Sequence, residues 1–316
     1  MSTALAIVAL AAGVAMVVAG AELFAEHLEG ASRRLGVSVF AVALLLAGAE
    51  PEELATTVAA SLRKVPAVAF GDVVGANIAM CLVALPVGAL VAPLPFGPRV
   101  RRYALLAVPL GVVAAAAAWG GRVSRPVGAL LVGGYVGYVV LIWVVERRPP
   151  ALGELAELGD HVVGSRPRRV GRELALVLLG VTALALGSII LVEAVRSISD
   201  VESTQTGVSL TLVGLATTLE LVVLAWSAAR RGVTEAVVAA VVGSFAYNAT
   251  MSLGAAALAR PLVIADAGLL RGPLVIMVMA LVAVIALGAR RGRLTGSGGM
   301  ALLIGYVAFV VYVVLR

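Results

Sequence analysis

Three glutamates lie close together in a segment that is otherwise apolar. The stretch LLLAGAEPEELATT contains Glu50, Glu52 and Glu53, and long hydrophobic runs flank it. Glu50 and Glu53 are three residues apart, so they share one face of a helix, whereas Glu52 lies about 100° around the helix from Glu53. A fourth glutamate, Glu220, stands in a second apolar segment. Carboxylates in such surroundings line cation or proton paths through membranes.

Other oxygen ligands accompany these glutamates. Ser244 and Asn248 are one helical turn apart in a later apolar segment, and Thr217 lies in the segment before it. Pro51 has no N–H, so the Ala47 carbonyl loses its helical partner and becomes available to a cation. Carboxylate, hydroxyl, amide and carbonyl oxygens are hard ligands, which suit Ca²⁺, Na⁺ or Mg²⁺ better than soft metals.

The composition of the whole chain indicates an integral membrane protein. Its 316 residues are 61% hydrophobic and 13% charged, whereas soluble domains are about 45–50% apolar and about 25% charged. The basic residues lie mostly between apolar segments and form no stripe interleaved with aromatics, which argues against nucleic-acid binding. Only two histidines occur and no catalytic pair lies at a plausible depth, so we expect no enzyme and no resident cofactor.

Ten segments are long and apolar enough to cross a bilayer, which takes about 20 residues. The polar stretch from Glu146 to Glu173 divides them into five and five. We therefore predict an all-α membrane protein with a first five-helix repeat (1–146), a linker (147–172) and a second five-helix repeat (173–316). The predicted spans are 3–25, 36–62, 66–92, 102–119, 126–146, 173–197, 206–229, 233–259, 272–289 and 299–315.

The distribution of basic residues predicts the orientation of these spans. If the N-terminus is outside the cell membrane, 16 of the 24 lysines and arginines fall in inside loops and 8 fall outside. Positive residues favour the cytoplasmic side. We therefore expect both termini outside and the 147–172 linker in the cytoplasm. An odd number of spans in each half then gives the halves opposite orientations.

The two halves are also related in sequence. The segment that starts at Gly20 aligns without a gap with the segment that starts at Gly187, and Glu53 then matches Glu220. An ionised group at the bilayer centre costs roughly 2.5 kcal/mol or more, so a matched pair of glutamates at mid-membrane depth carries more weight than matched leucines. Inverted repeats with a site at the midplane are the architecture of secondary transporters.

The paired motifs resemble those of the calcium/cation antiporter superfamily, which includes the sodium/calcium exchangers. Each half of that family carries G-T-S-L-P-E-L followed by G-N-V-V-G-S-N-I-F-N. The corresponding stretches here are GAEPEEL (Gly48–Leu54) with GDVVGANIAM (Gly71–Met80), and LATTLEL (Leu215–Leu221) with VVGSFAYN (Val241–Asn248). The resemblance implies alternating access, in which the first and sixth helices slide across the other eight.

The resemblance also implies a ligand set. Glu53 and Glu220 match the ion-binding glutamates of the family, while Ala76 and Met80 stand where its first half has Ser and Asn. The candidate cation ligands are Glu50, Glu53, Thr217, Glu220, Ser244 and Asn248, with Glu52, Asp72 and the Ala47 carbonyl as further candidates.

The sequence therefore predicts a secondary antiporter that exchanges Ca²⁺ for Na⁺ or H⁺ and whose partners are inorganic cations and the lipid bilayer. Two alternatives remain, a degenerate family member that does not transport and a ten-helix exporter of metabolites. The coupling ion, the stoichiometry, the direction of flux, the oligomeric state and the choice of Ca²⁺ over other cations stay open.

Overall fold

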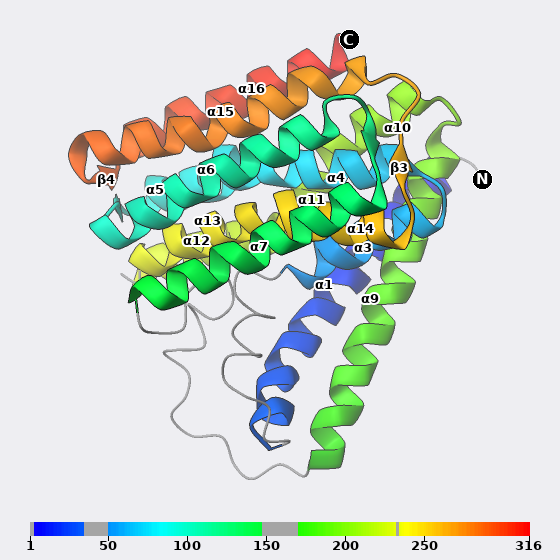
Figure 1. Ribbon diagram of the computed structural model, residues 1–316, viewed down its shortest axis with the longest axis horizontal. Coiled ribbons are helices and arrows are strands. Elements are labelled where there is room, and N and C mark those ends of the chain that lie inside the picture. Colours follow the sequence, from blue (N-terminus) through cyan, green and yellow to red (C-terminus); the bar gives the residue numbers. More distant parts are fainter. Residues whose placement is uncertain (1–2, 35–49, 147–169, 232–233) are drawn as a thin grey trace.

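The fold is a bundle of long helices, seen in a computed structural model that describes residues 3–34, 50–146, 170–231 and 234–316 (Figure 1). Nine helical stretches in these ranges are long and apolar enough to cross a membrane. Most of the predicted second span, residues 36–49, lies outside the described residues, as do Ala47 and linker residues 147–169.

Helices of the first half begin and end close to the predicted spans, except that the first helix continues into the charged sequence EHLEGASRR. Three short segments form one continuous span in the middle of this half, which we predicted as 66–92. The elements are α1 (Thr3–Arg34), α3 (Pro51–Leu62), α4 (Pro66–Ala79), η1 (Met80–Ala84), α5 (Leu85–Val91), β1 (Leu94–Pro95), α6 (Pro98–Ala118), β2 (Arg122–Val123) and α7 (Arg125–Glu146).

The second half has a similar order of elements. The predicted span 206–229 is divided into several pieces, because the helix is interrupted at Thr218. The elements are α9 (Val170–Ile198), α10 (Glu202–Val208), η2 (Ser209–Val213), α11 (Gly214–Thr217), α12 (Leu219–Arg231), α13 (Thr234–Ala246), η3 (Tyr247–Ser252), α14 (Leu253–Ala259), β3 (Leu262–Val263), α15 (Gly268–Arg291), β4 (Arg293–Leu294) and α16 (Gly296–Val314).

Two of the spans form the centre of the bundle. The α4–η1–α5 and α13–η3–α14 spans are 83% and 94% buried over their most apolar windows, whereas the other seven are 22–44% buried. The remaining helices surround this centre and present exposed leucine and valine side chains, as lipid-facing helices do. The hydrophobic core therefore lies around α4 and α13, directly beside the glutamates at the start of α3.

The segments η1, η2 and η3 are π-helical. A π turn inserts a residue into an α-helix and shifts the side chains that follow, and such turns are frequent at functional sites. Hydropathy alone did not predict them.

Helices α1 and α9 pack antiparallel through glycines. A Cβ atom on Gly13 would lie 3.0 Å from the Gly187 carbonyl oxygen, and one on Gly20 would lie 3.0 Å from the Gly180 carbonyl oxygen. In the reverse direction, a Cβ on Gly187 would lie 3.0 Å from the Gly13 carbonyl oxygen, and one on Gly180 would lie 2.9 Å from the Gly20 carbonyl oxygen. The two backbones can approach this closely only because all four residues lack a side chain. Figure 1 shows this helix pair extending away from the other helices.

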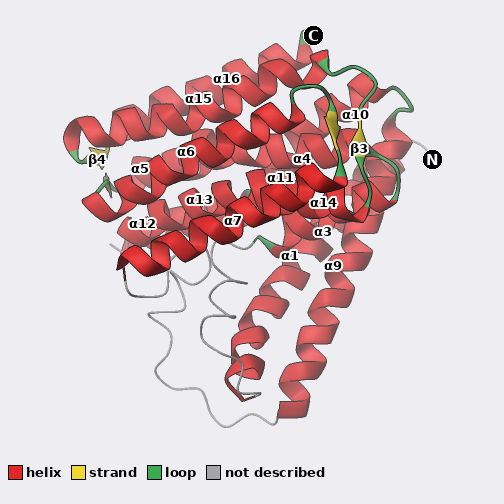
Figure 2. Cartoon of the chain, in the orientation of Figure 1, coloured by secondary structure: helices red, strands yellow, loops and turns green. Residues whose placement is uncertain are grey.

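Two short antiparallel ribbons connect the halves. Strand β1 pairs with β4, and β2 pairs with β3, so each ribbon takes one strand from each half. The ribbons lie at opposite ends of the bundle, as the labels β4 and β3 indicate in Figures 1 and 2. Because each pairing joins segments far apart in sequence, the ribbons hold the two halves side by side.

Candidate cation site

Glu50, Glu52 and Glu53 form a buried carboxylate cluster at the start of α3. One carboxylate oxygen from each glutamate lies within 4.8 Å of those of the other two. All three side chains are buried. Three acidic groups at this separation repel one another unless a cation or protons neutralise them.

The position of Glu52 corrects the helical-wheel argument. That argument assumed a continuous helix through the three glutamates and turned Glu52 away. Instead α3 begins at Pro51, and Glu50 has a non-helical backbone with φ −116° and ψ 86°. Pro51 is well suited to the first position of a helix, where no N–H is needed. Because Glu50 lies outside α3, its side chain is not held to the Glu53 face of the helix. It therefore converges with Glu52 and Glu53, which are both in the first turn of α3.

Several polar atoms of this region have no hydrogen-bond partner among the described residues. They include both carboxylate oxygens of Glu52, both of Glu53, and both amide atoms of Asn248. Burying a polar group without a partner costs free energy, so such groups usually bind another polar atom or an ion. The free oxygens of Glu52 and Glu53 are thus available to a cation.

Glu50 connects this cluster to the second half of the chain. The Ser244 hydroxyl, on α13, donates a hydrogen bond to a carboxylate oxygen of Glu50. Glu220, in the first turn of α12, lies near enough to Glu50 to interact with it electrostatically. Glu53 likewise occupies the first turn of α3, so the two matched glutamates have the same place in their helices.

Asp72 is the centre of a second set of contacts. Its two carboxylate oxygens accept hydrogen bonds from Thr217 at 3.3 Å and from Thr57 at 3.5 Å. Thr57 also donates to the Glu53 carbonyl one turn earlier. These bonds join α4, α11 and α3, and they place Asp72 next to the carboxylate cluster.

The helix break in the second half positions two hydroxyls. Thr218 lies between α11 and α12 and donates to the Gly214 carbonyl at 2.6 Å and to the Ala76 carbonyl at 3.4 Å. Gly214 allows this contact, because a Cβ there would lie 2.5 Å from the Ala76 nitrogen. Thr218 aligns with Pro51 in the sequence, so α3 and α12 both begin just before their matched glutamate.

The structure thus brings some candidate ligands into contact and leaves others apart. Glu50, Glu52, Glu53 and Ser244 form one group, and Asp72 and Thr217 form another beside it. Asn248 is buried in η3, and no hydrogen bond joins it to either group among the described residues. Ala76 and Met80 are fully buried and add no side-chain oxygen.

The predicted ligand set left out three residues of this region. Thr57 and Thr218 are buried hydroxyls that bond to the site. Thr57 had no signal beyond its position one turn after Glu53, and Thr218 was noticed as a hydroxyl beside Thr217 but not chosen as a ligand. Tyr135, on α7, is fully buried, its hydroxyl has no partner among the described residues, and it interacts electrostatically with Glu50. Its ring packs edge-on against Tyr247 at 5.2 Å. Nothing in the sequence of α7 distinguished this tyrosine.

Known proteins resemble this chain in both sequence and fold. The family model described as "Sodium/calcium exchanger protein" matches residues 5–144 and 173–315. The chain belongs to this family. The match includes the segments that carry Glu50, Glu53, Glu220 and Ser244, and it omits the linker.

Relatives of this exchanger-family protein match it to different extents. It is 34% identical over 84 residues to the sodium/calcium exchanger MaX1 of Methanosarcina acetivorans, a segment that spans 26% of this chain and only 24% of MaX1. It is 23% identical over 305 residues to a protein of Alkalimonas amylolytica named "Putative antiporter CaxA", with 95% of both chains covered.

Solved structures of the sodium-calcium exchanger NCX_Mj have the same fold. The structure soaked with zero Na⁺ and Ca²⁺ gives a TM-score of 0.60 at 20% identity and covers 100% of both chains. The structure soaked with Na⁺ and Sr²⁺ gives 0.62, and covers 98% of this chain and 99% of the other. This exchanger-family chain is therefore a multi-pass membrane protein of the same architecture.

Proposed function

We propose that this protein is a secondary cation antiporter that exchanges Ca²⁺ for Na⁺ or H⁺ at a site built on Glu50, Glu53 and Glu220. The observation that carries the proposal is the buried cluster of carboxylates with unpartnered oxygens, in a chain of the exchanger family. Ca²⁺ takes six to eight oxygen ligands in flexible geometry, and carboxylates supply the charge that compensates its dehydration.

The other members of the site have distinct roles in this proposal. Glu52 adds a third carboxylate, and Ser244 orients Glu50. Thr217 is held by Asp72 and lies ready to contribute its hydroxyl. Asn248 and the Ala47 carbonyl complete the proposed ligand set when the cation is bound. The first half lacks side-chain oxygens at Ala76 and Met80, and the extra carboxylate of Glu50 compensates for them.

An inverted repeat supports alternating access. We infer ten spans, with residues 36–62 as the second. The element order from α3 to α7 recurs from α12 to α16, so β1 corresponds to β3 and β2 corresponds to β4. Replacing each strand by its counterpart turns the β1–β4 pair into the β3–β2 pair, as a twofold relation between the halves requires. The α1–α9 glycine contacts are also reciprocal, since Gly13 and Gly180 occupy equivalent positions in the two halves. In this proposal α1 and α9 move as a pair to open the site to one side at a time.

Flux into proteoliposomes tests the proposal directly. The purified protein is reconstituted with Na⁺ inside, and uptake of Ca²⁺, Mg²⁺ and Mn²⁺ is measured with a Na⁺ gradient, a H⁺ gradient or neither. We expect Ca²⁺ uptake that depends on one of the two gradients. Equal uptake in empty liposomes, or uptake that needs no counter-ion, would refute antiport.

Cation binding without flux would favour the alternative that the protein is a degenerate family member that does not transport. The missing oxygens at Ala76 and Met80 are the observation that supports a member that binds cations but does not transport them. Isothermal titration with Ca²⁺ on the same preparation distinguishes this case, because such a member binds Ca²⁺ and gives no uptake. A metabolite exporter would show neither Ca²⁺ binding nor Ca²⁺ flux.

A further inference from the structure

An open cavity of about 450 Å³ lies at one end of the bundle, where α3, α7 and α14 meet. Its lining residues are Leu62, Arg125, Ala259, Arg260 and Pro261. This volume falls in the range of pockets that hold small ligands, about 300–1,000 Å³. None of the lining residues belongs to the candidate cation site, so the cavity has no part in the function proposed above.

Two guanidinium groups give this cavity a positive lining. Arg125 donates to the carbonyl oxygens of Leu258, at 3.1 Å, and Ala259, at 3.4 Å, which fixes it against the end of α14. The Arg260 guanidinium has no hydrogen bond or ion pair with any described residue, although the residue is exposed beside the cavity.

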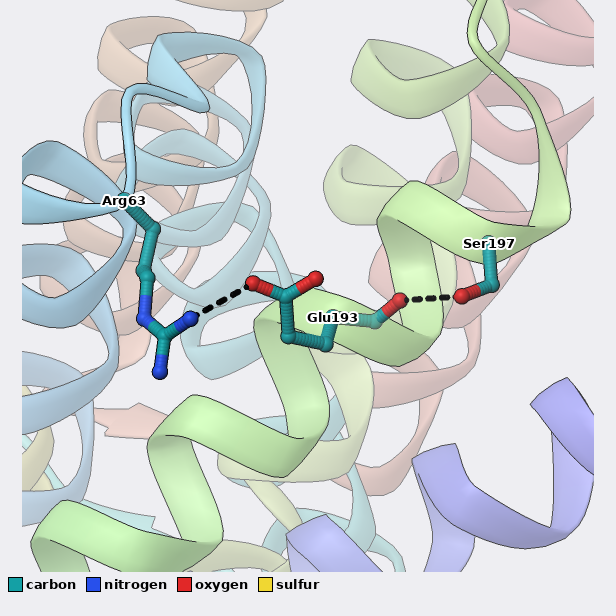
Figure 3. A network of polar contacts seen from close by, with 3 residues as sticks. All are labelled: Arg63, Glu193 and Ser197. Atoms are coloured by element: carbon teal, nitrogen blue, oxygen red, sulfur yellow. Dashed lines mark hydrogen bonds and ion pairs between the residues drawn. The ribbon is translucent and has the colours of Figure 1, made fainter. Parts of the chain in front are cut away.

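A neighbouring arginine, unlike Arg260, has its charge balanced by a carboxylate. Arg63, next to Leu62, forms an ion pair of 2.9 Å with Glu193 on α9 (Figure 3). Lys64, on the same turn, has no such partner among the described residues. Arg260, which lines the cavity, and Lys64, two residues after Leu62, are therefore cations whose charge no described carboxylate balances.

Part of the cavity lining is apolar. Leu62, which lines the cavity, is 60% exposed, and Leu258, next to Ala259 in the sequence, is 40% exposed. A cavity lined by two exposed arginines and an exposed leucine matches an amphipathic ligand with an anionic head and a hydrocarbon chain. Arginine forms charge-assisted, bidentate hydrogen bonds with phosphate.

We propose that this cavity binds the phosphodiester head group of an anionic phospholipid, with Arg260 and Arg125 on the phosphate and an acyl chain along Leu62. A soluble phosphate compound has the same anionic group but no hydrocarbon chain to pack against Leu62. The apolar part of the lining therefore favours the lipid.

Native mass spectrometry of the full-length protein tests the assignment. The protein is delipidated in detergent and mixed with phosphatidylglycerol, phosphatidylcholine or inorganic phosphate. We expect retained phosphatidylglycerol on the wild type, little phosphatidylcholine, and no retained phosphate. Arg260→Gln should lower phosphatidylglycerol affinity about fivefold, which corresponds to about 1 kcal/mol for one cation near a head group.

A matched variant controls for general surface charge. Arg122→Gln removes an exposed arginine from β2, three residues before Arg125 and outside the cavity lining, and it should retain wild-type affinity. Equal binding of the two lipids, or an equal loss in the two variants, overturns the proposal. Retention of inorganic phosphate with no preference for phosphatidylglycerol also overturns it. Arg260→Gln removes no hydrogen bond among the described residues, so a folding defect is not expected to obscure the result.

Discussion

Ser244 donates its hydroxyl to the Glu50 carboxylate, although 194 residues separate the two in sequence. Ser244 lies on α13 and Glu50 directly precedes α3, so this bond, like that between Thr217 and Asp72, connects the two halves at the candidate site. The hydroxyl partner of Glu50 thus comes from the second half, while the equivalent position in the first half is Ala76.

Loss of this hydroxyl is expected to weaken cation binding. Ser244→Ala leaves Glu50 buried without its donor, and a hydrogen bond to a charged group is worth roughly 1.5–3 kcal/mol. We predict that apparent Ca²⁺ affinity falls by about tenfold or more. Ser244→Thr keeps a hydroxyl and serves as the control in the same binding assay. Unchanged affinity in Ser244→Ala would show that Glu50 needs no orientation from α13.

The two matched glutamates are expected to be essential. Glu53→Gln and Glu220→Gln each remove a charge while preserving shape, so we predict loss of transport with near-normal expression and thermal stability. Removing a charge from the membrane centre does not destabilise a fold, because an ionised group there is itself costly. Proteoliposome uptake and a thermal melt are measured on the same sample. Full transport by Glu53→Gln would refute the ligand role of this residue.

Protons are expected to compete with the cation. A divalent ion and protons neutralise the same buried carboxylates, so cation binding should expel protons and acid should weaken cation binding. Ca²⁺ affinity measured between about pH 5.5 and pH 8.5, where clustered carboxylates titrate, should rise with pH. Glu50→Ser removes one of the three carboxylates and should flatten that dependence. An affinity that is flat with pH in the wild type would instead favour Na⁺ coupling.

Hydropathy predicted the membrane helices, and motif spacing pointed to Glu50 and Glu53, which the structure brings together; both signals depend on local sequence. The described spans begin and end within a few residues of the prediction except for α1 and the divided span that includes Thr218. The convergence of Glu52 with Glu50 was not predicted, because it depends on the φ and ψ angles of Glu50 at a helix start.

Contacts between distant segments could not be predicted from the sequence for a different reason. Each apolar helix can pack in many registers with similar hydrophobic gain, so composition does not select one. The Thr217–Asp72 bond and the Arg63–Glu193 ion pair depend on that register. Three π-helical turns also shift the register inside the central spans.

The predicted orientation can be tested by cysteine labelling. Gly120→Cys places a thiol at an exposed position with open space around it, in the loop between α6 and α7. Ser165→Cys places one in the linker. We predict that an impermeant maleimide labels Gly120→Cys in intact cells and labels Ser165→Cys only after permeabilisation. Cys81 is buried and should contribute no background. The opposite labelling pattern would place both termini in the cytoplasm.

The glycine contacts between α1 and α9 are expected to determine how closely these helices pack. A Cβ on Gly20 would lie 2.7 Å from the Leu184 nitrogen, and one on Gly187 would lie 2.8 Å from the Val17 nitrogen, so neither position has room for a methyl group. Gly20→Ala or Gly187→Ala must push the helices apart, and overpacking of this kind costs about 1–3 kcal/mol. We predict a lower melting temperature and slower Ca²⁺ uptake for both variants. Gly133→Ala on α7 is the matched control, since nothing lies within 4 Å of its Cβ position. Equal melting temperatures and uptake rates for all three variants and the wild type would mean that α1 and α9 do not need this close contact.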